Sequence, residues 1–277
     1  MRADRPSSTA TLIAMSTVLL ARDARFAQYV PPGADVLCER CLTGAQRWLT
    51  RRPALARAIE RATIPGLCLH FMLRKRWIEH AVRSALARGA RRVVVIGAGY
   101  DTLVLRLARQ FPALRFTEVD HPATQAVKRA ALAASPNVRF VAADLARTPL
   151  VSALAGALGP EPSVFVVEGL LMYLTGEETA ALLAAVHRLQ AAGGELVFAV
   201  MEPAAEGAVR FHNATWLERA ILALWREPFR SAVRREELAA LLAGLGFELR
   251  EWADLAAMHP ELPLARGELV AHALRPT

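Results

Sequence analysis

Short runs of β-branched and other apolar residues alternate with alanine- and leucine-rich stretches between residues 91 and 200. Strand-like runs separated by helical stretches are typical of βαβ units, and nearly continuous apolar character indicates strands covered on both faces. The pattern predicts an α/β fold with a doubly wound, mostly parallel sheet. The five runs are Arg92–Ile96, Leu114–Val119, Val138–Val141, Ser163–Val167 and Glu195–Val200.

The chain beyond residue 200 carries a different pattern. Residues 205–245 return to helical periodicity, with one apolar face supplied by Trp216, Ile221, Leu224 and Trp225. Two final runs, Phe247–Trp252 and Glu268–Leu274, are joined by a loop that contains prolines. We expect this closing pair to extend the sheet with antiparallel strands.

The first 90 residues are helical in pattern and contain no convincing strand. We therefore predict an N-terminal helical cap with a lead-in helix over residues 1–90, followed by a core over residues 91–277. Within the core, a helical insert near 205–230 is expected to shape the ligand pocket. No internal repeat or low-complexity linker suggests a further division.

Composition narrows the range of partners. The chain has 277 residues, 54% of them hydrophobic, and a formal net charge of +8. Lysine occurs only at Lys75 and Lys128, and the arginines are spread along the chain instead of forming a basic stripe. A nucleic-acid partner would be supported by clustered basic residues, so we expect none.

Cysteine content and hydropathy bear on the cellular setting. Three cysteines make a disulfide framework improbable and suit a reducing compartment. Cys38 and Cys41 form a C-x-x-C without a second pair, so we expect a packed helical face and no metal. The run Thr11–Ala21 resembles a signal peptide, but Asp4 interrupts its basic region and the run contains hydroxyl residues. We interpret it as a packed helix, and expect no membrane span and a cytoplasmic protein.

The residues that follow the predicted strands indicate a ligand site, because ligands of open parallel sheets bind beyond the carboxyl ends of the strands. Gly97, Ala98 and Gly99 follow the first strand, where the two glycines allow a tight turn and close approach of a ligand. Asp120 follows the second, 21 residues after Gly99, at the interval of a ribose-binding acid. A tight turn without a ligand is the alternative.

Two further acids follow later strands. Asp144 and Leu145 could hold the amino group and ring of an adenine, with a helix N-cap as the alternative role of Asp144. Glu168 follows the fourth strand and could face an ammonium group. Acids after three strands favour S-adenosylmethionine over a dinucleotide, whose phosphates need donors, and the third glycine of the dinucleotide fingerprint is missing.

The carboxylate of S-adenosylmethionine requires a cation, and the helix before the first strand can supply it. Arg74 falls on one stripe with Ile78, Ala81 and Ala85, whereas Arg76 lies on a polar face. A cation on an apolar stripe is costly unless it is paired, so Arg74 is the predicted ligand contact. A structurally paired arginine is the alternative.

Taken together, these stretches resemble the leucine carboxyl methyltransferase family, in family order and spacing over roughly residues 70–200. The matching segments are RKRWIE (Arg74–Glu79), VVVIGAGYDT (Val93–Thr102), EVDHPATQAVK (Glu118–Lys128), AADL (Ala142–Leu145) and EGLLMYL (Glu168–Leu174). The resemblance implies a class I methyltransferase fold, Rossmann-like, with a seven-stranded sheet and S-adenosylmethionine as cofactor. Leu103 stands where many members have arginine, which resembles a bacterial subgroup acting on small molecules.

The resemblance also implies roles for individual residues. Arg74 would hold the methionyl carboxylate, Asp120 the ribose and Glu168 the amino group. Asp144 and Leu145 would take the adenine, while the glycine turn would line the cofactor. Tyr173 is implied to lie near the methyl-transfer site.

The predicted activity is O-methylation of a carboxylate on a small metabolite, such as a polyketide or peptide acid. An ionised carboxylate needs no general base, and no histidine stands at an obvious strand tip. Methylation of a phenol or hydroxyl is the alternative, with His212 as the candidate base. An NAD-dependent oxidoreductase and an inactive binding module are weaker alternatives. The sequence leaves the oligomeric state open, a homodimer being one option.

Overall fold

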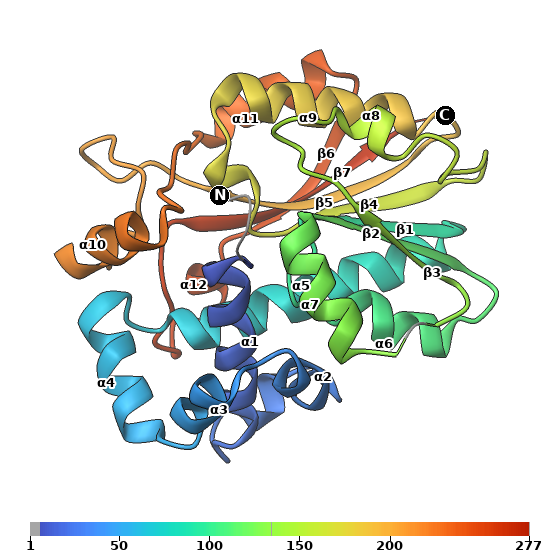
Figure 1. Cartoon of the computed structure of the whole chain (residues 1–277). Coiled ribbons are helices and arrows are strands. Elements are labelled where there is room, and N and C mark those ends of the chain that lie inside the picture. Colours follow the sequence, from blue (N-terminus) through green and yellow to red (C-terminus); the bar gives the residue numbers. More distant parts are fainter. Residues whose placement is uncertain (1–5, 134, 277) are drawn as a thin grey trace.

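The computed structural model of the chain describes residues 6–133 and 135–276; residues 1–5, with Asp4, lie outside them. Its centre is a seven-stranded sheet in the order β3-β2-β1-β4-β5-β7-β6 (Figure 1). β1 to β5 are parallel, whereas β7 pairs antiparallel with both β5 and β6. The strands are β1 (Arg92–Ile96), β2 (Arg115–Asp120), β3 (Val138–Ala142), β4 (Ser163–Val167), β5 (Gly194–Met201), β6 (Glu248–Ala253) and β7 (Glu268–Arg275).

This order confirms the predicted doubly wound sheet with an antiparallel extension, and each predicted strand lies within one residue of its observed ends. Strand order reverses between β1 and β4, which are neighbours although two βα units separate them in sequence. The switch point of an open sheet is where ligands bind. The segments following β1 and β4 therefore frame the site.

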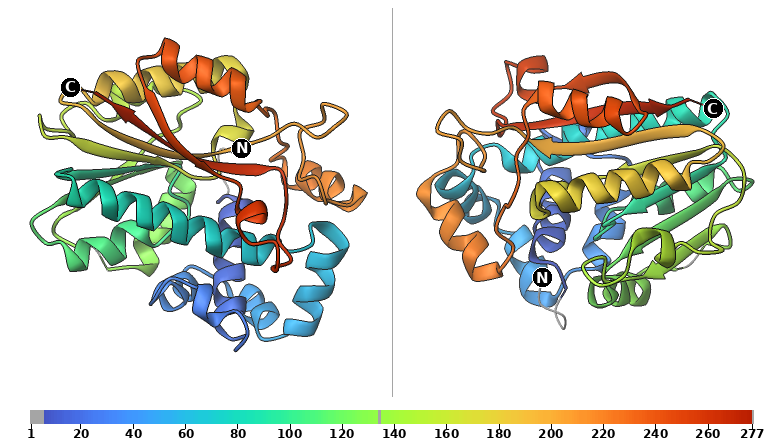
Figure 2. Two further views of the ribbon diagram at one scale, coloured as in Figure 1. Left: turned by 180° about the vertical axis from the view of Figure 1, so that it is seen from behind. Right: turned by 90° about the horizontal axis from the view of Figure 1, so that it is seen from above.

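Helices cover both faces of the sheet (Figures 1 and 2). Alternate residues of β1 explain this arrangement: Val93 and Val95 pack in the core beneath α5 and α6, whereas Val94 and Ile96 face the core beneath α8, α9 and α11. The helices of these two layers are α5 (Leu67–Ala87), α6 (Leu103–Gln110), α7 (Pro122–Ala131), α8 (Leu150–Ala153), α9 (Gly176–Leu189), α11 (Arg235–Gly244) and α12 (Leu255–Met258).

The N-terminal segment forms a helical cap that lies beside the α5–α6–α7 layer (Figure 1). The cap helices are α1 (Ser8–Ala21), α2 (Ala34–Arg40), α3 (Gly44–Thr50) and α4 (Pro53–Thr63), with a 3-10 turn η1 (Ala27–Tyr29). The signal-like run Thr11–Ala21 is the body of α1, whose N-cap Ser7 accepts a hydrogen bond from the N–H of Ala10. α1 contacts α2, α3 and α5, so its apolar residues are covered by the protein itself.

The lead-in helix α5 belongs to the sheet as much as to the cap, because it contacts β4, β5 and β7. The division of the chain near residue 90 stays a prediction. Among residues 6–133 and 135–276, we find no helix that combines the length and the apolar character needed to cross a membrane. Cys38 and Cys41 are buried free thiols at the end of α2, as expected for a packed face.

The predicted helix over residues 205–245 is wrong in part. The described structure has α10 (Trp216–Trp225) and α11 there, and the remainder is loop. α10 ends at Arg226, which adopts a left-handed conformation, and Pro228 prevents a direct continuation. The four residues predicted to form one apolar face of this helix do not share one environment. Trp216 and Leu224 are 73% and 78% exposed, whereas Ile221 and Trp225 line a cavity.

Candidate cofactor and acceptor site

The turn after β1 is held by the acid at the tip of β2. Gly97 and Gly99 have φ angles of 69° and 51°, in the left-handed region that glycine tolerates best. Asp120 Oδ2 accepts a hydrogen bond from the N–H of Gly99, and its Oδ1 accepts one from the N–H of His121 at 2.6 Å. Burial raises the pKa of Asp120, although these donors and Lys128 oppose the shift. The predicted glycine turn and ribose-binding acid thus lie in direct contact.

The space above this turn is closely bounded. A Cβ at Gly97 would lie 3.2 Å from the side chain of Leu170, and one at Gly99 would lie 3.0 Å from Cβ of Ala10 in α1. Ala98 between them is buried. The cap helix α1 therefore forms a wall over the glycine turn.

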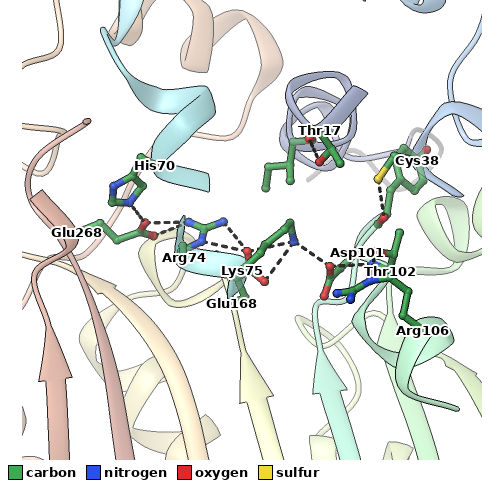
Figure 3. A network of polar contacts seen from close by, with 12 residues as sticks. Thr17, Cys38, His70, Arg74, Lys75, Asp101, Thr102, Arg106, Glu168 and Glu268 are labelled. Atoms are coloured by element: carbon green, nitrogen blue, oxygen red, sulfur yellow. Dashed lines mark hydrogen bonds and ion pairs between the residues drawn. The ribbon is translucent and has the colours of Figure 1, made fainter. Parts of the chain in front are cut away.

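Arg74 lies in a buried ion network between α5 and the sheet (Figure 3). Its Nη1 donates to both oxygens of Glu268 on β7, at 2.7 and 2.9 Å, and its Nε donates to Glu168 Oε1 at 3.0 Å. His70 Nε2 lies 2.6 Å from Glu268 Oε2. The prediction that Arg74 is buried and Arg76 exposed is confirmed, and Arg74 is paired within the protein.

Charge balance fixes the ionisation of this network. Burial opposes the charge of Arg74, but Glu268 and Glu168 outweigh it and raise the pKa of the guanidinium. Burial alone would raise the pKa of Glu268, yet Arg74 and the hydrogen bond from His70 lower it to about 2. Nη2 of Arg74 makes no hydrogen bond, although it lies 2.9 Å from Glu168 Oε1, and a Cβ at Gly169 would lie only 3.5 Å from it. This nitrogen is therefore held by charge to Glu168 and lies beside the glycine of the turn after β4.

Lys75 extends the network to the tip of β1 (Figure 3). Its Nζ donates to Asp101 Oδ1 at 2.9 Å and to Glu168 at 3.2 and 3.3 Å. Burial would raise the pKa of Asp101, but Lys75 lowers it to about 2. Burial likewise opposes the charge of Lys75, but Asp101 and Glu168 raise its pKa. Glu168 thus pairs with two cations of the protein. The ammonium group of a ligand, its predicted partner, would have to compete with both.

Asp144 and Leu145 follow β3, at the side of the sheet away from the Arg74 network. Asp144 Oδ1 accepts a hydrogen bond from the N–H of Ala146 at 3.1 Å, so the acid caps a turn and not the N-terminus of α8. Leu145 is half-buried against the core of the α8–α9 layer.

A cavity of about 620 Å³ opens between the cap, the segments that follow β1 and β4, and α10. Arg74, Tyr100 and Gly169 line it at the sheet, whereas Glu218 of α10 lines it opposite them. Its walls are otherwise mostly apolar: the lining includes Leu12, Ile13, Leu67, Phe71, Met172, Phe211, Ile221, Leu222, Trp225 and Phe229. This size is typical of sites for small organic ligands.

Tyr173 lines the cavity, from the 3-10 turn η2 (Leu171–Tyr173) after β4. Its hydroxyl lies 2.9 Å from Thr9 Oγ1, and Thr9 Oγ1 donates to Glu227 at 2.6 Å. Glu227 also accepts from the N–H groups of Ser8 and Thr9 at 3.0 Å, so it caps α1. Burial raises the pKa of Tyr173, which keeps the phenol neutral.

His212 does not lie at this cavity. Its side chain is exposed, its Nε2 lies 3.2 Å from the carbonyl oxygen of Glu202, and its ring would clash with a Cβ at Gly267. His212 is thus a surface histidine beside the carbonyl of Glu202 and the backbone of Gly267, and its role as a base stays a prediction.

Three residues of the site were not predicted. Lys75 could have been noticed as one of only two lysines in the chain. Glu218 lies on one stripe with Ile221, Leu222 and Trp225, so the test that found Arg74 would also have found it. Glu268 begins a strand far along the chain and gives no local signal. Over residues 6–133 and 135–276 we find no cluster of metal-binding side chains.

The sequence profile of the leucine carboxyl methyltransferase family matches residues 14–187, more than half of the chain. The chain belongs to the leucine carboxyl methyltransferase family. The resemblance drawn from the five motifs is therefore confirmed, and four of the motifs lie within the glycine turn and the segments at the tips of β2, β3 and β4 described above.

Individual relatives agree with this family. A protein of Mycobacterium avium (strain 104), provisionally named an S-adenosyl-L-methionine-dependent methyltransferase, is 32% identical over 210 residues, 70% of this chain and 64% of that protein. A similarly named protein of Frankia alni is 31% identical over 219 residues, 75% of this chain and 69% of that protein. The match thus spans less than two thirds of the M. avium relative.

Among solved structures, a provisionally named methyltransferase from Thermobifida fusca has a TM-score of 0.62 and 18% identity, over 99% of this chain and 96% of that one. At this identity the likeness shows the fold alone. The fold is that of the class I methyltransferases, as predicted.

Proposed function

We propose that the chain is an S-adenosylmethionine-dependent methyltransferase that transfers a methyl group to an oxygen of a small-molecule acceptor. The observation that carries this proposal is the cavity of about 620 Å³, which joins Arg74 and Gly169 at the cofactor edge to the apolar wall of α10. Family membership and the names of the relatives support the cofactor. The cavity supports an acceptor of small-molecule size.

The residues present fit this cofactor in part: of those predicted to bind it, Arg74 lines the cavity, and the others lie outside the described lining. Arg74 Nη2 is buried and pairs with Glu168 Oε1 at 2.9 Å, and the methionyl carboxylate would share this nitrogen, beside a glycine that leaves room for it. Asp120 would receive the ribose hydroxyls, and Asp144 with Leu145 the adenine. When bound, S-adenosylmethionine supplies a methyl group activated by its sulfonium. The protein then has to align the acceptor oxygen with that methyl group and exclude water, which the apolar cavity walls support.

The cavity favours a hydroxyl acceptor over the carboxylate predicted from the sequence. Arg74 is the only basic residue in the described lining, and its charge is already balanced by Glu268 and Glu168. An acceptor carboxylate would therefore enter an apolar space with no free cation and one acid, Glu218, which is a costly arrangement. A neutral hydroxyl or phenol carries no such cost.

Calorimetric titration tests the cofactor assignment. Folded protein should bind S-adenosylmethionine and not NADH. Asp120→Ala should weaken binding about tenfold or more, since it removes a partner that accepts hydrogen bonds. Arg76→Ala is the matched control, because Arg76 is exposed and donates only to the carbonyl of Gln28. Absence of heat with S-adenosylmethionine, or a larger loss for Arg76→Ala, would refute the assignment.

We further propose a cytoplasmic location and a homodimer for the whole protein. A cytoplasmic location and a homodimer are both compatible with the buried free cysteines and with the exposed residues of α10. Fractionation of the host cell and light scattering of the purified protein would examine them.

A further inference from the structure

Glu218 is a buried carboxylate that forms no ion pair within the described residues. It lies in the first turn of α10, is 2% exposed and lines the cavity. Neither of its carboxylate oxygens has a hydrogen-bond partner of normal geometry in the described structure, although the backbone N–H of Phe211 lies near enough to favour the ionised form. Buried polar groups are satisfied in the great majority of cases, so an unsatisfied acid facing a ligand cavity indicates a role toward a ligand.

A purely structural role at the helix end does not account for it. Thr215 and Glu218 have the spacing of a capping box, in which the glutamate would accept from the N–H of Thr215. That N–H instead donates to the carbonyl of Thr63 at 2.8 Å. Thr175 and Glu178 show the same motif fully formed at α9. Glu218 therefore occupies the capping position but is not used as a cap.

The charged groups around Glu218 leave it uncompensated. Arg210 and Arg219 are near enough to favour its ionised form, but neither forms an ion pair with it, and Arg210 is bound to Glu206. On the neighbouring helix α4, Glu60 accepts from the N–H of Cys68 at 2.9 Å. Across the cavity, Arg74 is balanced by its own acids. Burial is the strongest influence and raises the pKa of Glu218 to about 7.

We propose that Glu218 is the general base of the reaction and that the acceptor is a neutral compound with an ionisable hydroxyl, such as a phenol. This inference rests on the proposed methyltransferase function and names the acceptor class of that same site. The acceptor O–H donates to the Glu218 carboxylate, which takes the proton as the oxygen forms its bond to the methyl carbon. The methyl–sulfur bond breaks with its electron pair remaining on sulfur, so S-adenosylhomocysteine and the methyl ether leave, and Glu218 returns its proton to water.

Matched probes test the acceptor class without relying on turnover. 4-Phenylphenol and biphenyl-4-carboxylate have the same shape and differ in charge, so their affinities can be compared by calorimetry at pH 8 with S-adenosylhomocysteine present. The wild type should bind the phenol at least about tenfold more tightly, because a hydrogen bond to an ionised acceptor is strong. Glu218→Gln should reduce this ratio about tenfold or more. Equal affinities, an unchanged ratio, or no binding of either probe would overturn the proposal.

Turnover of the phenol separates a catalytic from a binding role. Product should carry the mass of one added methylene group, and Glu218→Gln should lower kcat by about 10²- to 10⁴-fold while leaving cofactor affinity unchanged. Glu178→Gln, at the formed capping box, is the control expected to keep full activity. If S-adenosylmethionine binds and only the Glu218 effects are missing, this inference fails alone. If the cofactor does not bind the wild type, the proposed function fails first.

Discussion

Removing the acid that balances Arg74 should weaken the whole fold. In Glu268→Gln, the isosteric amide keeps the shape but leaves Arg74 without the carboxylate whose two oxygens accept from its Nη1. The pKa of Glu268 falls from 4.5 to about 2 on folding, which corresponds to about 3 kcal/mol of stability at neutral pH. For a protein of this size, we expect Tm to fall by about 6–12 °C. Because a lowered pKa stabilises only above the unfolded value, the contribution is lost as the pH falls from about 4.5 to 2.

Thermal unfolding followed by circular dichroism at pH 7 and pH 3 measures this effect. Glu161→Gln is the matched control, because it breaks an ion pair of 2.6 Å with Arg92 in which the glutamate is solvent-exposed. The control should change Tm little, since exposed pairs contribute little. An unchanged Tm for Glu268→Gln at pH 7, or a difference from wild type that is as large at pH 3, would refute the reasoning about the network.

Three further outcomes follow from buried groups elsewhere. Glu218→Leu should raise Tm at pH 8 and not at pH 4.5. Folding raises the pKa of Glu218 from 4.5 to about 7, so its ionised form destabilises the folded protein only at pH values above 4.5; equal gains in Tm at both pH values would contradict this. Glu227→Gln should speed amide hydrogen exchange in α1, because the Glu227 carboxylate accepts three hydrogen bonds from Ser8 and Thr9. Unchanged exchange would show that Glu227 does not stabilise the start of this helix. A thiol reagent should label native protein far more slowly than unfolded protein, because burial raises the pKa of each thiol at Cys38, Cys41 and Cys68.

Residues that depend on periodicity could be predicted from the sequence. The apolar runs located every strand to within one residue, because a strand covered on both faces must be apolar along its length. Helical phasing separated Arg74 from Arg76, because Arg74 shares a buried stripe with Ile78, Ala81 and Ala85 whereas Arg76 is exposed. What failed in part was the helical region predicted over residues 205–245, where the described structure has two helices, α10 and α11, and loops before and between them. There the proline and the left-handed Arg226 override helix propensity.

Residues that depend on long-range contact could not be predicted in the same way. Arg74 and Glu268 are 194 positions apart, and only the return of β7 beside β5 brings the acid to the N-terminal half of α5. The exposure of His212 likewise depends on how the insert packs, which no local pattern specifies. Glu218 is a different case, because an acid on an apolar stripe was visible in the sequence but could be explained as a capping box. Only the contact of Thr215 with Thr63 removes that explanation.

The two lysines show why the net charge of +8 says little about the site. Lys75 and Lys128 are both buried, and each lies against a carboxylate: Lys75 at Asp101 and Glu168, and Lys128 at 2.6 Å from Glu118. Each neutralises acids near a strand tip, where a compact ammonium fits and the wider arginine fork would need more space. The exposed arginines that set the net charge take no part in this balance. The charges that line the described cavity are therefore local: Arg74 is paired with acids at the sheet, whereas Glu218 on α10 forms no ion pair within the described residues.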